Sequence, residues 1–171
     1  MALPAPFYQD SLVTLYNADC RDILPQLASA SVGICISDPP DRDGNSAALA
    51  ILLGQIHNDL VRICAHVVLM THMVPVLGTG QNKNNIVSSD CGFTVDGVTV
   101  ATARIADPDM KSTGWANVIS TRAAAGVSVL DPFAGGGGWI LLAAKRAGRQ
   151  AIGIELDPEA CARSAAHIAA G

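Results

Sequence analysis

The chain is poor in aromatic and charged residues. Of its 171 residues, 4% are aromatic and 15% are charged, whereas 50% are hydrophobic. Disordered chains have the opposite composition, with low hydrophobicity and high charge, so we expect a folded protein with a packed core. The length predicts one domain that spans residues 1–171 and leaves little room for another.

Positive charge is also scarce. Eleven Lys and Arg residues stand against fifteen Asp and Glu residues, which gives a formal net charge of −4. Domains that bind nucleic acid by themselves usually present a basic face. The composition therefore argues against a stand-alone nucleic-acid binder.

Long apolar runs, a leader sequence and paired cysteines are missing as well. The apolar run 67–70 lies between His66 and His72 and is far shorter than the roughly 20 residues that span a bilayer. The first six residues, Met-Ala-Leu-Pro-Ala-Pro, do not resemble a signal peptide. The five cysteines are scattered, with no Cys-x-x-Cys pair for zinc or redox chemistry. We therefore expect a cytoplasmic protein with reduced thiols, no membrane association and no metal.

Alternating strands and helices are what the sequence does contain. Strands separated by helices predict an α/β fold, a mostly parallel sheet with helices on both faces. The predicted strands are 12–16, 31–37, 65–70, 127–130 and 150–154, with a hairpin at 93–105; the predicted helices are 20–27, 47–64, 115–125, 139–147 and 158–169, and 71–92 is a long loop.

A glycine-rich segment joins a predicted strand to a predicted helix. Residues 129–138 read Val-Leu-Asp-Pro-Phe-Ala-Gly-Gly-Gly-Gly. Glycines let backbone N–H groups approach a ligand closely. Glu155 ends the next strand, where an acidic side chain can accept hydrogen bonds from both hydroxyls of a ribose. Together these features predict an adenosine-containing ligand.

The residues before the glycines discriminate between adenosine ligands. Dinucleotide sites usually contain G-x-G-x-x-G and place a pyrophosphate at the helix N-terminus, where the Asp131 carboxylate would repel it. Asp131 could instead accept a hydrogen bond from the amino group of a methionine moiety or organise the loop. No Walker sequence is present. S-adenosylmethionine (SAM), with a positive sulfonium and no phosphate, fits best.

A second motif follows the predicted strand 31–37. Residues 37–41 read Ser-Asp-Pro-Pro-Asp, at the edge where open α/β sheets bind ligands. The prolines hold Asp38 extended and leave nearby carbonyls without local N–H partners. An exocyclic amino group is a poor nucleophile, and acceptors around its hydrogens localise its lone pair. The motif therefore suits amino-group methylation, although Asp-Pro-Pro also occurs as a plain surface turn.

With both motifs in this order, the chain resembles the permuted (beta) class of DNA amino-methyltransferases, which modify adenine-N6 or cytosine-N4. Residues 13–40 and 129–159 carry the resemblance, with the catalytic block before the cofactor block. The resemblance implies a Rossmann-like SAM-dependent methyltransferase fold. It also implies a role for each matching residue.

These implied roles fall into two groups. The cofactor-binding group comprises Asp19 and Cys20 near the adenine, Asp131, Phe133, Ala134, Gly135 and Gly137 along the methionine and ribose, and Glu155 on the ribose. The catalytic group comprises Asp38, Pro39 and Pro40, which engage the target amino group, and Asp41.

Asp41 stands where the family has an aromatic residue that stacks on the flipped base. Stacking of this kind contributes about 1–3 kcal/mol, and the aspartate adds negative charge beside DNA. Three functions stay open. The first is a short, phage-type DNA methyltransferase with adenine favoured over cytosine, little or no separate target-recognition domain, and a homodimer or partner subunit. The second is a SAM-binding relic or regulator, and the third is a methyltransferase of RNA or a small amine.

Overall fold

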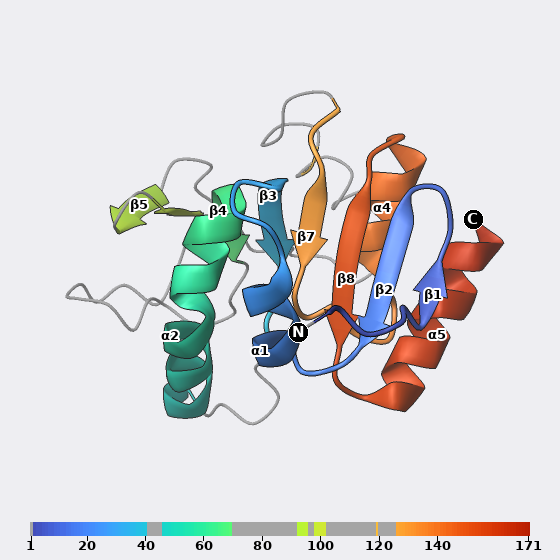
Figure 1. The fold of residues 1–171 in the computed structure, drawn as a ribbon, viewed down its shortest axis with the longest axis horizontal. Helices are drawn as coiled ribbons and strands as arrows, with labels where there is room; N and C mark the ends of the chain where they lie inside the picture. The colour runs from blue at the N-terminus through green and yellow to red at the C-terminus, as the bar shows by residue number, and fades with distance from the viewer. Residues whose placement is uncertain (1, 41–45, 70–91, 96–97, 102–118, 120–125) are drawn as a thin grey trace, which may run out of the picture.

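The protein is built on a six-stranded sheet with the order β1-β2-β8-β7-β3-β4 (Figure 1). The computed structural model describes residues 2–40, 46–69, 92–95, 98–101, 119 and 126–171. In the sheet, β1 runs antiparallel to β2, and all other neighbouring pairs are parallel. The strands are β1 (Tyr8–Gln9), β2 (Val13–Asn17), β3 (Val32–Ser37), β4 (Cys64–Leu69), β7 (Val129–Asp131) and β8 (Ala151–Glu155).

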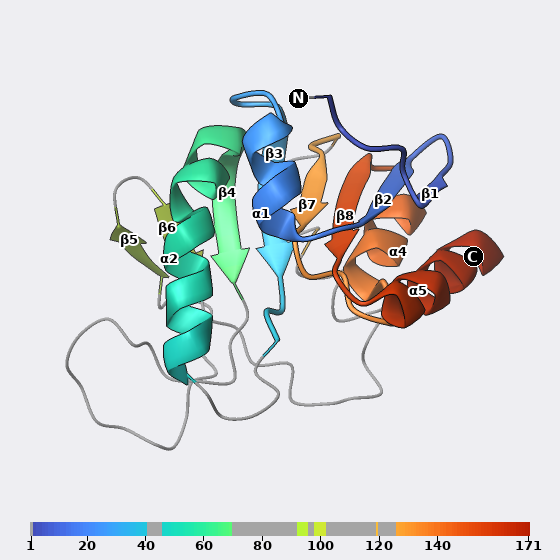
Figure 2. The same cartoon turned by 60° about the horizontal axis from the view of Figure 1, so that its bottom comes forward.

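Helices cover both faces of this sheet (Figure 2). On one face lie α1 (Cys20–Ile23), the 3-10 helix η1 (Leu24–Gln26) and α2 (Ser46–Ile63). On the other lie α4 (Trp139–Arg146) and α5 (Pro158–Ala170). A buried apolar cluster fills each interface, and β3 is almost wholly buried because it is covered on both sides. The predicted α/β fold is confirmed.

The strand order reverses between two neighbouring strands. Strand β7 leads into α4 on one face, whereas β3 leads into α2 on the other. The two strands pair in parallel, with Cys35 opposite Leu130. Such a topological switch point opens a crevice at the carboxyl ends of the strands, which is where α/β sheets bind ligands.

The helix ends follow local sequence signals, with one difference from prediction. Asp157 caps α5 by accepting a hydrogen bond from the Glu159 N–H. The predicted helix 20–27 instead changes to a 3-10 helix at Leu24, because Pro25 has no N–H to continue the α-helical hydrogen bonds.

The remaining predicted elements are partly described. The predicted hairpin 93–105 corresponds to β5 (Gly92–Val95) and β6 (Val98–Ala101), which pair antiparallel. The predicted loop 71–92, apart from its last residue, and the predicted helix 115–125, apart from Ile119, lie outside the described residues. Strand β1 was not predicted, because two residues are too few to show a pattern.

Two further expectations, reduced thiols and no membrane association, concern the cysteines and the helices in the described part of the chain. Cys20, Cys35, Cys64 and Cys161 are all free and buried. Among the described helices, none combines the length and the apolar character needed to cross a bilayer.

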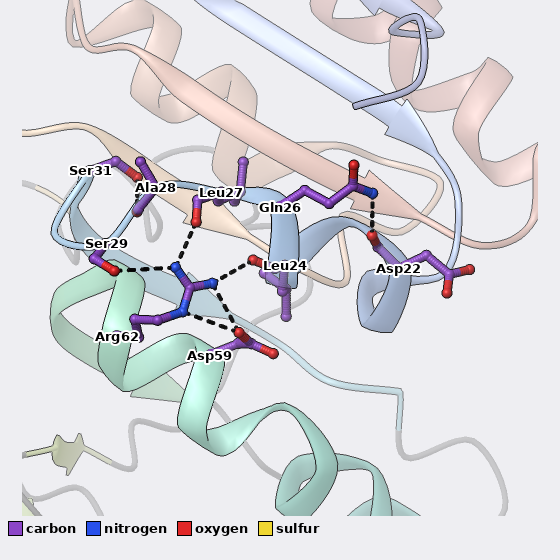
Figure 3. Close-up of polar contacts among 9 residues, drawn as sticks. All are labelled: Asp22, Leu24, Gln26, Leu27, Ala28, Ser29, Ser31, Asp59 and Arg62. Carbon is purple, nitrogen blue, oxygen red and sulfur yellow. Dashed lines mark hydrogen bonds and ion pairs between the residues drawn. The ribbon is translucent and has the colours of Figure 1, made fainter. Parts of the chain in front are cut away.

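Arg62 fastens α2 to the segment that follows α1 (Figure 3). Its guanidinium donates hydrogen bonds to the carbonyl oxygens of Leu24 at 2.9 Å and Leu27 at 2.6 Å. It also forms an ion pair with Asp59 at 2.9 Å. The Leu24 carbonyl, which already accepts from the Leu27 N–H, and the Leu27 carbonyl thereby gain a charged donor.

We expect Arg62→Met to lower the free energy of unfolding by about 1–3 kcal/mol, because the partly buried carbonyls of Leu24 and Leu27 lose a charged donor. Chemical denaturation with circular dichroism measures this change. The matched control is Arg146→Met, because Arg146 is exposed and, among the described residues, its guanidinium donates to the carbonyl of Gly171. Equal stability of the two variants would contradict the assigned role of Arg62.

Candidate cofactor and catalytic site

Four parallel strands deliver the predicted site residues to one edge of the sheet. Glu155 ends β8 and Asp131 ends β7. Asp19 follows β2, and Asp38 follows β3. Because these strands are parallel, their carboxyl ends share one edge, at and beside the switch point.

The two motifs touch at the switch point itself. The Ser37 hydroxyl donates a hydrogen bond to Asp131 Oδ1 at 2.5 Å, and the Phe133 N–H donates to the same oxygen at 3.1 Å. Asp131 is only 1% exposed. Of the two roles considered for Asp131, its burial and contacts favour organising the loop over contacting a ligand directly.

The surroundings of Asp131 change its protonation. The pKa of its carboxyl is raised from 3.8 to about 7, mainly by burial and also by the negative charges of Asp38 and Glu155. Hydrogen bonds from Ser37 and Phe133 oppose this rise in pKa. The Asp131 carboxyl is therefore partly protonated near neutral pH, whereas an ordinary aspartate is fully ionised there.

Glu155 links β8 to the glycine loop. One carboxylate oxygen accepts from the Gly135 N–H at 2.7 Å, and the other accepts from the Asp157 N–H at 2.8 Å. Gly135 has a φ of +63°, in the left-handed region that favours glycine. Each carboxylate oxygen can accept a further hydrogen bond, so a fixed pair of acceptors is presented at the strand end.

The end of β2 is held beside Glu155. The Ala18 N–H donates to the Glu155 carbonyl at 3.0 Å. The next residue, Asp19, caps α1 and pairs with Arg21 at 2.5 Å, and this hydrogen bond lowers the pKa of Asp19. Burial raises the pKa of the Cys20 thiol to about 11, so this side chain offers an apolar contact and no thiolate.

The Asp-Pro-Pro turn stands next to the buried carboxyl group. Asp38 and Pro40 are exposed, and Pro39 is buried. The charge of Asp38 is close enough to raise the pKa of Asp131. Asp41 lies outside the described residues.

The residues at this edge fit SAM better than a phosphate-bearing ligand. Three carboxyl groups, those of Asp38, Asp131 and Glu155, interact electrostatically there. Such an edge favours a cationic ligand and disfavours pyrophosphate. At Gly135 the space that a Cβ would occupy is open, with the Phe133 carbonyl oxygen 4.0 Å away. In the described residues, no cluster of three or more His, Cys, Asp or Glu side chains is arranged to hold a metal ion.

Ser37 is a site residue that the sequence analysis missed. The sequence feature that could have identified it is a polar residue directly after the apolar run 32–36, in a strand that is buried on both faces. A fully buried hydroxyl needs a partner, and here the partner is 94 positions away along the chain.

No family model and no curated protein sequence matches this chain. Solved structures do match it. A protein of Thermus thermophilus, assigned as a DNA modification methylase, is 20% identical with a TM-score of 0.59, covering 91% of this chain and 94% of its own. The same protein complexed with S-adenosyl-L-methionine gives a TM-score of 0.58 at 16% identity, over the same shares. The PvuII cytosine-N4-specific DNA methyltransferase gives 0.59 at 14% identity, covering 94% of this chain and 88% of its own.

This chain has the SAM-dependent methyltransferase fold. The likeness extends over most of each compared chain, and it confirms the predicted Rossmann-like architecture. The neighbour that was crystallised with S-adenosyl-L-methionine agrees with the predicted cofactor.

The raised pKa of Asp131 predicts a pH-dependent stability difference. The folded state binds this proton more tightly than the unfolded state does, so the stabilisation is complete below about pH 4 and is lost as the pH rises toward 7. Relative to Asp131→Asn, we expect the wild-type free energy of unfolding to fall by about 2–3 kcal/mol between pH 5 and pH 8. Denaturant titrations of both proteins across this range measure it, and parallel curves would rule it out.

Proposed function

We propose that this chain is a SAM-dependent methyltransferase of the permuted amino-methyltransferase class, which methylates the exocyclic amino group of a DNA base, adenine in preference to cytosine. One observation carries the proposal: the hydrogen bond from Ser37 to Asp131 joins the Asp-Pro-Pro turn to the glycine loop at the switch point. Amino-group methylation needs this adjacency, because the nucleophile and the methyl donor must meet in one crevice.

The glycine-loop side of the crevice would hold the cofactor. When bound, SAM supplies an electrophilic methyl group on a positively charged sulfonium. We assign the ribose hydroxyls to the Glu155 carboxylate and the adenine to the segment of Asp19 and Cys20 beside it. We assign the methionine moiety of SAM to the loop that Asp131 organises, which includes Phe133, Ala134, Gly135 and Gly137. The acidic edge and the SAM-bound structural neighbour support this assignment.

The Asp-Pro-Pro side would engage the target amino group. The Asp38 carboxylate and a carbonyl of Pro39 or Pro40 accept its two hydrogens. With those hydrogens held, the nitrogen lone pair is less delocalised into the base and is aimed in one direction. The exposure of Asp38 supports this role, because a catalytic acceptor must be reachable by a base flipped out of the helix.

The net charge of −4 constrains how DNA is bound. We propose that a second copy or a partner subunit supplies the positive surface that this chain lacks, because phosphate contacts contribute most of the affinity for DNA. The aspartate at position 41 also leaves an RNA or a small amine as a second candidate substrate, since neither needs stacking of a flipped base.

Tritium transfer from labelled SAM tests the reaction. We expect incorporation into DNA at adenine-N6, and we expect Asp38→Ala to lower kcat by about 100-fold or more. The Kd for SAM should change far less, because the exposed Asp38 carboxylate bonds the acceptor and adds only part of the negative charge at this edge. The acceptor panel includes RNA and small amines. Label in RNA or an amine alone would favour the second candidate, and SAM binding without transfer to any acceptor would indicate a cofactor-binding relic or regulator.

Calorimetry tests the cofactor site. We expect Glu155→Ala to weaken SAM binding by about 1–3 kcal/mol, because hydrogen bonds to a charged group are lost. The matched control is Glu159→Ala, which removes an exposed carboxylate from the first turn of α5. A Kd that Glu155→Ala leaves unchanged would refute the assigned ribose site, and a wild-type chain that does not bind SAM would overturn the proposed function.

A further inference from the structure

Helix α5 runs along the glycine loop and contacts three successive glycines. The carbonyl oxygen of Gly137 lies 2.6 Å from Nδ1 of His167. A Cβ on Gly136 would lie 3.1 Å from the guanidinium of Arg163, and a Cβ on Gly138 would overlap the Ser164 hydroxyl. The loop is therefore held from the side of α5, and the contact with His167 is a hydrogen bond.

The direction and geometry of this hydrogen bond are defined. A carbonyl oxygen only accepts, so Nδ1 of His167 carries the hydrogen and donates it. The ring of Trp139, the first residue of α4, meets the His167 ring edge to face, with 4.2 Å between centroids and 79° between planes. A Cβ on Gly137 would overlap the same indole. Trp139 thus orients the imidazole of His167 and also packs against Gly137, the residue whose carbonyl accepts the hydrogen bond from this imidazole.

The loop needs such an external contact because its own sequence provides little restraint. Its last glycine, Gly138, is the N-cap of α4, with a φ of +55° and no side chain to accept from the first turn. Ordering a residue's backbone costs about 1–2 kcal/mol, and glycine loses more conformational freedom than any other residue. Four glycines in succession would sample many conformations if nothing held their carbonyls.

We propose that His167 is a positioning residue for the cofactor loop. By holding the Gly137 carbonyl against α5, it keeps the loop in the single conformation in which the Gly135 N–H reaches Glu155. His167 contacts neither substrate nor reacting atoms in this scheme; it acts through the backbone. The inference rests on the proposed function, in which SAM binds at this loop.

Three variants of His167 separate the hydrogen bond from the ring. His167→Phe keeps a ring against Trp139 and removes the donor; His167→Asn places an amide N–H where Nδ1 stood; His167→Gln places it farther out. The control, His57→Phe, makes the same change on α2, on the opposite face of the sheet. SAM Kd by calorimetry, the KM for SAM and kcat are measured for all four variants and the wild type.

We expect His167→Phe and His167→Gln to raise the Kd and the KM for SAM about 5- to 30-fold, the loss that one hydrogen bond explains, with a much smaller change in kcat. His167→Asn stays within about three-fold of the wild type, since the donor is restored. If His167→Phe does not fold, the comparison of His167→Asn with His167→Gln tests the positioning role. Wild-type affinity for SAM in His167→Phe, or equal losses of affinity in His167→Asn and His167→Gln, would overturn the inference.

Hydrogen exchange without SAM separates the inference from the proposed function. We expect faster exchange of the Gly135 amide, which donates to Glu155, in His167→Phe than in the wild type or in His57→Phe. Unchanged exchange would overturn the positioning role. Faster exchange in a chain whose wild type does not bind SAM would support the loop contact while refuting the proposed function.

Discussion

The hydrogen bond between Ser37 and Asp131 determines where everything else at the site can lie. It joins the ends of two adjacent strands whose following helices go to opposite faces of the sheet. Burying a carboxyl group is unfavourable unless partners surround it, and here a hydroxyl and a backbone N–H share one oxygen. A displacement of either strand would break this set of contacts, so the turn after β3 and the loop after β7 keep a fixed separation.

Acidity at the edge of the sheet has opposite effects on the two partners of the proposed reaction. The carboxyl groups of Asp38, Asp131 and Glu155 attract a sulfonium, and they repel the phosphates of DNA. Partial protonation of Asp131 near neutral pH reduces the negative charge at the centre of the crevice. In the proposed function, the sign of the charge on an adenosine ligand therefore affects how well it binds at this edge.

Much of this arrangement was predictable because its signals are local. Glycines after a buried strand and an acidic residue at the next strand end act over a few residues, and each lies where it was expected. The bond from Ser37 to Asp131 was not predictable, because periodicity locates strands without giving their order in the sheet. The contacts of His167 with Gly137 and of Arg62 with Leu24 likewise depend on how helices pack, which no spacing in the sequence encodes.

The pairing of β2 with β8 has a consequence for how this chain folds. Asn17 and Glu155 are opposite one another in register although 138 positions separate them. Closing so long a loop is entropically costly and slows folding relative to local pairing. On the ribosome, β3 and β4 can pair early, but β2 waits for β8, whose paired residues follow it by 138 positions. A nascent chain that stops short of β8 therefore contains the Asp-Pro-Pro turn and the glycine loop, but it lacks Glu155 and the strand that lies between β2 and β7.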